Sequence, residues 1–172
     1  MTDRPIIFSA PMVRALLDGR KTMTRRLAWR NREPNYLPCP TPWQSVEAGE
    51  RLWVKETFFI SKTGLQYAAD LPEQEQREHR RVRKITTDLE IVERWTSPIH
   101  MSRRLSRITL AVTATKIEPL QKISNAESIA EGCSNLLQFA ELWRSLHDDD
   151  SWSLNPEVVA ITFEVHKRNI DA

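Results

Sequence analysis

Two segments in the C-terminal half alternate between apolar and other residues, and this pattern constrains the fold more than any other feature. Residues 107–117 and 157–166 each place their large apolar side chains on every second position. Strict alternation predicts strands with one buried face, as in antiparallel sheets. The apolar positions are Ile108, Leu110, Val112 and Ala114 in the first segment, and Val159, Ile161, Phe163 and Val165 in the second.

Shorter elements are predicted around these two strands. Leu52 and Val54 alternate within a strand over residues 51–55, residues 22–27 form another strand, and Thr57 to Ile60 extend the strand at 51–55. Ser9 followed by Pro11 predicts a capped helix that ends at Gly19.

Two more helices are expected between the long strands. Ser124 and Glu127 form a capping box for a helix that ends at Gly132. A helix over residues 135–147 follows, with a buried stripe of Phe139, Leu142, Trp143 and Leu146. Helices between alternating strands indicate an α+β fold, with a curved or closed antiparallel sheet flanked by short helices.

A chain of 172 residues fits a single domain over residues 1–172. Four prolines between residues 34 and 42 predict an irregular loop within residues 27–48. Residues 61–94 are polar and rich in charges of both signs, so they are read as an insertion with one helix near residues 73–82.

The composition bounds the environment and the partners of the protein. A net charge of +2 excludes a uniformly basic nucleic-acid-binding surface, although arginines cluster between residues 20 and 32 and between residues 103 and 107. Only two cysteines are present and no apolar run approaches the ~18 residues of a membrane span, so we expect a cytoplasmic protein without a membrane partner.

Four glycines leave little scope for a phosphate-binding loop, and His147 with the acidic residues 148–150 lacks metal-ligand spacing, so neither cofactor nor metal is predicted. The oligomeric state is left open.

Residues 19–26 carry the most chemistry in the chain, in the order Gly-Arg-Lys-Thr-Met-Thr-Arg-Arg. A lysine, two hydroxyls and guanidinium groups can bind a phosphate, polarise a carbonyl or activate an amine. Cations are also favoured after a helix C-terminus, which alone accounts for Arg20 and Lys21.

Several separated motifs follow one another along the chain. They are residues 4–12 (RPIIFSAPM), residues 19–26, the Gly-Glu turn at residues 49–50, residues 95–101 (WTSPIHM), Ala-Glu-Gly at residues 130–132, and Asn-Pro at residues 155–156. Their order resembles the ASCH domain, a PUA-like β-barrel family linked to RNA metabolism, and most closely its phage and prophage members. The resemblance implies a PUA-like barrel and covers the chain apart from the loops at residues 27–48 and 61–94.

One branch of that family removes the acetyl group from N4-acetylcytidine. The resemblance to this branch implies that Lys21, Thr24 and Glu131 are catalytic. In the alternative reading, Lys21 only compensates the helix dipole, Thr24 is an ordinary strand residue, and Glu131 pairs with an arginine. Glu131 lies in a last helical turn, where a carboxylate is disfavoured, and such local conflicts occur at functional sites.

Further residues are predicted to contact a nucleoside or nucleic acid, either RNA or modified DNA. They are Arg20, Thr22, Arg25, Arg26, Trp53, Lys55, His100, Arg103 and Arg104. Trp53 can stack on a base or fill a core layer, and a lone histidine such as His100 is more often structural.

Three functions therefore follow as hypotheses. The first is hydrolysis of the amide of an N4-acylated cytidine or a related modified base, with no cofactor. The second is non-catalytic RNA or DNA binding through arginines, and the third is a ribonuclease, for which no histidine pair is present.

Overall fold

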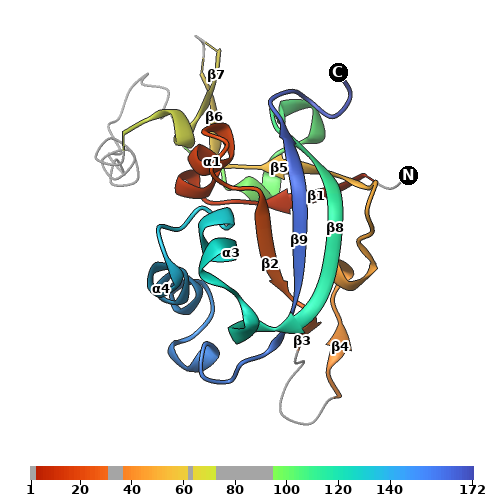
Figure 1. Ribbon diagram of the computed structural model, residues 1–172. Helices are drawn as coiled ribbons and strands as arrows, with labels where there is room; N and C mark the ends of the chain where they lie inside the picture. The colour runs from red at the N-terminus through yellow and green to blue at the C-terminus, as the bar shows by residue number, and fades with distance from the viewer. Residues whose placement is uncertain (1–2, 31–36, 62–63, 73–94) are drawn as a thin grey trace.

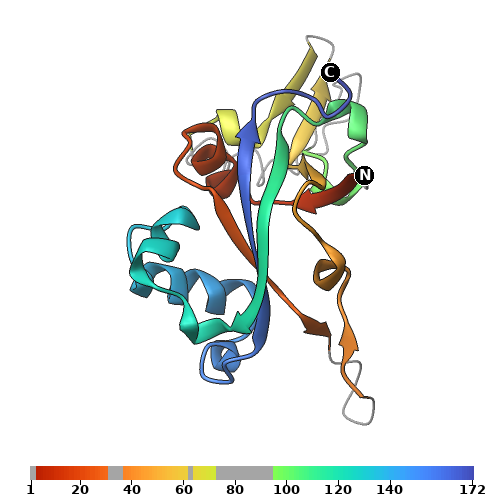
Figure 2. The same cartoon turned by 45° about the vertical axis from the view of Figure 1, so that its right-hand side comes forward.

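The computed structural model describes residues 3–30, 37–61, 64–72 and 95–172. A five-stranded mixed sheet forms the body, and the helices α1, α3 and α4 lie to one side of strands β2, β9 and β8 (Figures 1 and 2). The helix predicted near residues 73–82 lies outside the described residues. In the described part of the chain, no helix has the length and apolarity to cross a lipid bilayer.

The sheet has the order β1-β5-β8-β9-β2. Its strands are β1 (Asp3–Ile7), β5 (Arg51–Lys55), β8 (Thr109–Pro119), β9 (Glu157–His166) and β2 (Met23–Leu27). The first two strands pair in parallel, and the other neighbours are antiparallel. The prediction of an α+β fold is confirmed, but the sheet is mixed because β1, which the alternation did not reveal, joins β5 in parallel.

The described strands form no closed barrel, because β1 and β2 are the two edges of the sheet. A side chain links these edges instead of a backbone ladder: Arg26 Nη2 on β2 donates to Ile7 O at the end of β1 over 2.9 Å. The sheet curves strongly along β8, which Figure 1 shows as a long bowed strand. Edge strand β1 carries an exposed proline, Pro5.

The main core lies on the face of the sheet that the alternation predicted. Leu110 and Ile161 are fully buried, as are Leu52 and Val54 of β5. Ala114 is exposed, contrary to the pattern, because the β8–β9 register shifts between Val112 and Ala114.

A second core lies on the opposite face of β9. Val158 is buried there against Phe139 and Trp143 of α4 (Leu136–Leu146), together with Leu120 and Ile123. Strand β9 is therefore buried on both faces, which explains why residues 158–161 are all buried. Trp143 is in the core as predicted, whereas Leu146 at the end of the stripe is exposed.

The helix boundaries follow the predicted signals closely. Helix α1 spans Ala10–Leu17 and is followed by Gly19 at φ +73°, although the Ser9 side chain makes no capping hydrogen bond. Helix α3 spans Asn125–Ala130, and both bonds of the Ser124–Glu127 capping box are present.

The remaining elements are short. Strands β3 (Trp29–Arg30) and β4 (Cys39–Pro40) pair within the proline-rich segment. Strands β6 (Phe58–Ser61) and β7 (Gly64–Tyr67) form a separate hairpin, so residues 57–60 do not extend β5 as predicted. Short 3-10 turns occupy Pro42–Ser45, Ala68–Asp70, Pro98–His100, Arg103–Leu105, Leu120–Lys122 and Asp149–Ser151.

Candidate active site

A cavity of about 410 Å³ lies between the N-terminal end of α1, strand β2, the end of α3 and helix α4. Its polar lining contains all three side chains that the resemblance singles out, Lys21, Thr24 and Glu131. Arg25 and Arg26 also line it. A cavity of this size, with a few polar groups in apolar walls, is typical of a small-molecule site.

Lys21 and Glu131 are in direct contact although 110 positions separate them. The Lys21 Nζ donates to Glu131 Oε2 over 2.8 Å and to the Glu131 backbone oxygen over 2.7 Å. The two residues also form a backbone bridge, which the bond from Thr22 N to Ala130 O (2.8 Å) extends. Both side chains are buried, so main chain and side chain together hold the pair in place.

Local backbone geometry brings the two residues together. Gly19 ends α1 and lets the chain turn back, so that Lys21 N donates to Ala15 O. Glu131 is the C-cap of α3, and Gly132 follows at φ +87°. A Cβ at Gly132 would lie 3.0 Å from Ala15 Cβ and 3.4 Å from Lys21 Cβ, so glycine allows the close approach of α3 to α1.

Burial lowers the pKa of the Lys21 ammonium below its ordinary value, and the opposing effect of Glu131 does not cancel this shift. A buried lysine with a lowered pKa can accept a proton more readily than a surface lysine at neutral pH.

Thr24 contributes a buried hydroxyl to the same cavity. It lies in β2 opposite Ile161 of β9, so the sheet fixes its backbone. A threonine hydroxyl can donate to a carbonyl oxygen or accept from an amine.

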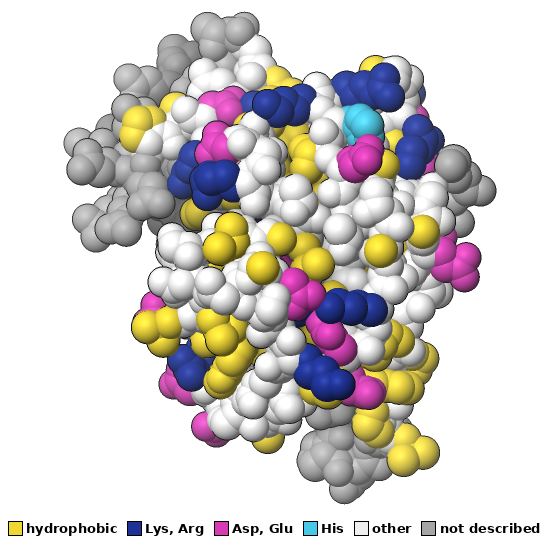
Figure 3. All heavy atoms as spheres, in the orientation of Figure 1, with side chains coloured by type: hydrophobic (Ala, Val, Ile, Leu, Met, Phe, Trp, Pro, Cys, Tyr) yellow, Lys and Arg dark blue, Asp and Glu magenta, His cyan; other side chains and the backbone are white. Residues whose placement is uncertain are grey.

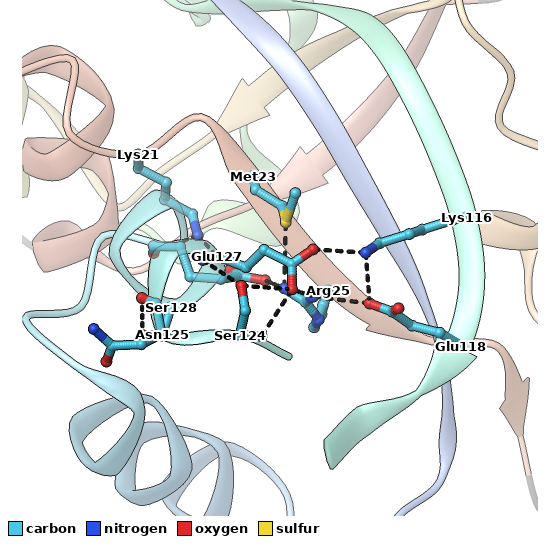
Figure 4. A network of polar contacts seen from close by, with 10 residues as sticks. Lys21, Met23, Arg25, Lys116, Glu118, Ser124, Asn125, Glu127 and Ser128 are labelled. Carbon is cyan, nitrogen blue, oxygen red and sulfur yellow. Dashed lines mark hydrogen bonds and ion pairs between the residues drawn. The ribbon is translucent and has the colours of Figure 1, made fainter. Parts of the chain in front are cut away.

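Arg25 is held by three carboxylates, of which Figure 4 labels Glu118 and Glu127. Its Nη2 contacts Glu118 over 2.9 Å and Glu127 over 3.1 Å, and its Nη1 contacts Glu131 over 3.4 Å. Lys116 completes the network through Glu118 and Glu127. The guanidinium of Arg25 is therefore engaged with protein carboxylates, one of which is Glu131 itself.

Arg26 lies at the cavity in a different environment. Its guanidinium carbon is 5.1 Å from the centre of the Phe8 ring and 5.8 Å from that of Trp43. Such contacts favour a cation over an aromatic face.

The opposite wall of the cavity is apolar and aromatic. Phe139, Leu142 and Trp143 of α4 line it, and His147 stacks on Trp143 with ring centres 4.2 Å apart. Burial lowers the pKa of His147, which favours the neutral imidazole. The sequence predicts this stripe to be core, and Phe139 and Trp143 do pack in the second core. A cavity wall and a core face have the same helical spacing, so the spacing does not reveal the cavity. No sequence signal distinguished the two.

Other residues predicted to contact a ligand lie away from this cavity. Arg20 and Thr22 are exposed, and Arg20 pairs with Asp18 over 2.9 Å. Lys55 Nζ lies 5.4 Å from the ring of Trp53 and donates to Ile99 O over 2.6 Å.

The second arginine cluster also lies outside the cavity lining. Arg103 contacts Asp3 over 2.6 Å and also binds Asp171, so it ties the start of β1 to the last residues of the chain. Arg104 and His100 are exposed in neighbouring turns. Within the described residues, no three His, Cys, Asp or Glu side chains gather in a metal-binding arrangement.

Comparison with known proteins leaves the family open. No family model and no curated protein matches the chain. Among solved structures, it is similar to protein EF3133 from Enterococcus faecalis V583, of the DUF984 family, at 14% identity and a TM-score of 0.46. That alignment covers 99% of this chain and 83% of the other.

Proposed function

We propose that this protein is an ASCH-type, PUA-like hydrolase that cleaves the amide of an N4-acylated cytidine or a related modified base. The observation that carries the proposal is the buried contact between Lys21 and Glu131 in a cavity that Thr24 also lines. The wall that α4 contributes to the cavity is apolar, which suits a planar base.

The three polar side chains divide the reaction between them. Lys21 accepts a proton from a water molecule, and the resulting hydroxide adds to the acyl carbonyl carbon. The Thr24 hydroxyl donates a hydrogen bond to the carbonyl oxygen as negative charge develops there.

The second half of the reaction breaks the bond between the carbonyl carbon and N4. Glu131, 2.8 Å from Lys21 Nζ, relays the proton from Lys21 to the departing nitrogen. The products are the free amine of the base and the carboxylic acid, and Lys21 returns to its starting state.

The test is incubation of the purified protein with N4-acetylcytidine and its 5′-monophosphate, followed by chromatography of the products. We expect deacetylation by the wild type and a loss of about 10²–10⁴-fold in Lys21→Ala, because the proton acceptor is removed. Lys122→Ala is the matched control, since Lys122 is exposed on a turn outside the cavity lining.

Two results would contradict this function. One is the absence of product from either compound, and the other is a rate in Lys21→Ala equal to that of the Lys122→Ala control. A circular dichroism spectrum of each variant separates loss of chemistry from loss of fold.

The non-catalytic binding hypothesis has less structural support. Two of the arginines on which it depends, Arg25 and Arg103, are already bound to carboxylates of the protein. Phosphate groups of a nucleic acid would have to compete with these ion pairs.

A further inference from the structure

The basic groups of the ionic network beside the cavity already have carboxylate partners. Lys21, Arg25 and Lys116 contact Glu118, Glu127 and Glu131, three groups of each kind. Each basic group of the network is therefore already engaged with the protein.

Arg26 stands outside this network. Its guanidinium donates to Ile7 O over 2.9 Å and lies against the rings of Phe8 and Trp43. Among the described residues, Arg26 forms no ion pair with a carboxylate, and Glu131 acts on it only through its charge. Arg26 is therefore a cation in the cavity lining without a carboxylate in direct contact.

The position of Arg26 directs this charge into the cavity. Arg26 lines the same cavity as Lys21 and His147, and its positive charge adds to the burial that lowers the pKa of both. The N-cap Ser9 and the first residues of α1, Ala10 to Met12, also line the cavity, and a helix N-terminus adds positive potential. A guanidinium has five N–H donors, and one donates to Ile7 O, so donors remain for a ligand.

We propose that Arg26 binds an anionic group of the substrate, and that the substrate is a nucleotide monophosphate with the acylated base rather than an uncharged nucleoside. Only the acyl group on the base is taken from the proposed function, and the anion site does not depend on it. Arg26 binds the 5′-phosphate, and the base lies toward Lys21, Glu131 and the wall of α4. Arginine suits this role because its planar fork binds phosphate oxygens in pairs.

The inference is tested with reaction products, which carry no acyl group and need no catalysis. Binding of cytidine 5′-monophosphate, cytidine and inorganic phosphate is measured by isothermal titration at low ionic strength. We expect the nucleotide to bind the wild type about tenfold tighter than either cytidine or inorganic phosphate, and this preference to weaken with added salt.

Variants test whether Arg26 is responsible for the preference for the nucleotide. Arg26→Gln is expected to bind nucleotide and nucleoside equally, and Arg26→Lys to keep part of the preference because it keeps the charge. Arg168→Gln, an exposed arginine beyond β9, is the matched control and is expected to behave as the wild type.

Equal binding of nucleotide and nucleoside by the wild type, or an unchanged preference in Arg26→Gln, would overturn the inference. So would inorganic phosphate binding as tightly as the nucleotide, or no binding of any of the three compounds. A nucleotide preference without deacetylation supports the anion site and removes the proposed reaction. Deacetylation without a nucleotide preference supports the proposed reaction and removes the anion site.

Discussion

At the scale of single residues, Arg25 contributes both to the stability of the fold and to the geometry of the candidate site. Its side chain is fully removed from solvent, and burying a charge costs several kcal/mol unless partners compensate. Glu118, Glu127 and Glu131 supply that compensation. The Glu131 contact has a second effect, because it fixes one carboxylate oxygen while the other oxygen faces Lys21 Nζ. Arg25 is therefore a positioning residue for Glu131.

Replacement of Arg25 by glutamine is expected to lower the free energy of unfolding by about 3–5 kcal/mol, because three buried or half-buried carboxylates lose their shared cation. Urea denaturation at pH 7 measures this change. Arg20→Gln is the control, because Arg20 and Asp18 are each more than half exposed and such surface pairs contribute about 0–1 kcal/mol. Equal losses in the two variants would show that the network does not stabilise the fold.

At the scale of elements, the junction between α3 and α1 depends on one glycine. Gly132 has φ +87°, which disfavours side chains, and a Cβ at this position would meet Ala15 and Lys21. Glu131, the C-cap of α3, immediately precedes Gly132. Any displacement there moves the carboxylate relative to the amine.

Gly132→Ala is expected to destabilise the protein by about 1–3 kcal/mol and to reduce deacetylation, because it adds both strain and a contact at 3.0 Å. Gly49→Ala is the matched control: its φ is +91°, and its new Cβ would meet nothing within 4 Å. That variant is expected to lose stability through strain alone and to keep its activity. Thermal unfolding and the product assay check both, and an active Gly132→Ala would show that the junction tolerates the shift.

The elements also differ in how well the sequence predicts them. Strand β9 has its predicted boundaries, and β8 begins and ends two residues later than predicted. The alternation of apolar and other residues along the chain is enough to predict such strands. Strand β1 was missed because its partner β5 is 48 positions away in register, and parallel pairing leaves no local signature. Likewise, Gly64 alone did not reveal the β6–β7 hairpin.

For the candidate site, the sequence indicated which side chains lie together better than it indicated what surrounds them. Motif resemblance brought Lys21, Thr24 and Glu131 forward, and they share one cavity. Arg25 was predicted to bind the ligand, but the structure pairs it with three carboxylates of the protein. These partners come from β8, α3 and the end of α3, over 90 positions away. Phe139 and Trp143 of α4 lie in the core as predicted, but the sequence did not indicate that they also line the cavity. These contacts depend on tertiary packing, which periodicity does not encode.

At the scale of the whole molecule, the ionic network joins the helical layer to the sheet. Glu127 of α3 accepts from Lys116 of β8 over 2.6 Å and from Arg25 of β2 over 3.1 Å. Burial raises the pKa of Glu127, but the bonds from Lys116 and from the Ser124 backbone, with the charge of Arg25, outweigh this and lower it to about 2. Its usual value is 4.5, so the folded state favours the ionised form.

This shift predicts acid sensitivity with a definite window. A depressed carboxyl pKa stabilises the fold fully above pH 4.5, and the contribution is lost as the pH falls from 4.5 toward about 2. The stability difference between wild type and Glu127→Gln is therefore expected to be constant near neutral pH and to shrink across that window. Urea titrations at a series of pH values measure it. A difference that stays the same down to pH 2 would contradict the role of Glu127 as an ionised tie between the layers.

The two borders of the open sheet have a consequence for self-association. At β1, Pro5 has no amide hydrogen to offer an incoming chain, and proline on a border strand is a recognised deterrent to sheet-to-sheet addition. Just before β2, the bridge from Lys21 to Glu131 and the bond from Thr22 to Ala130 already pair residues 21–22 with the end of α3. A proline in one border and a paired approach to the other both shorten the template that the curved sheet offers to a growing fibril.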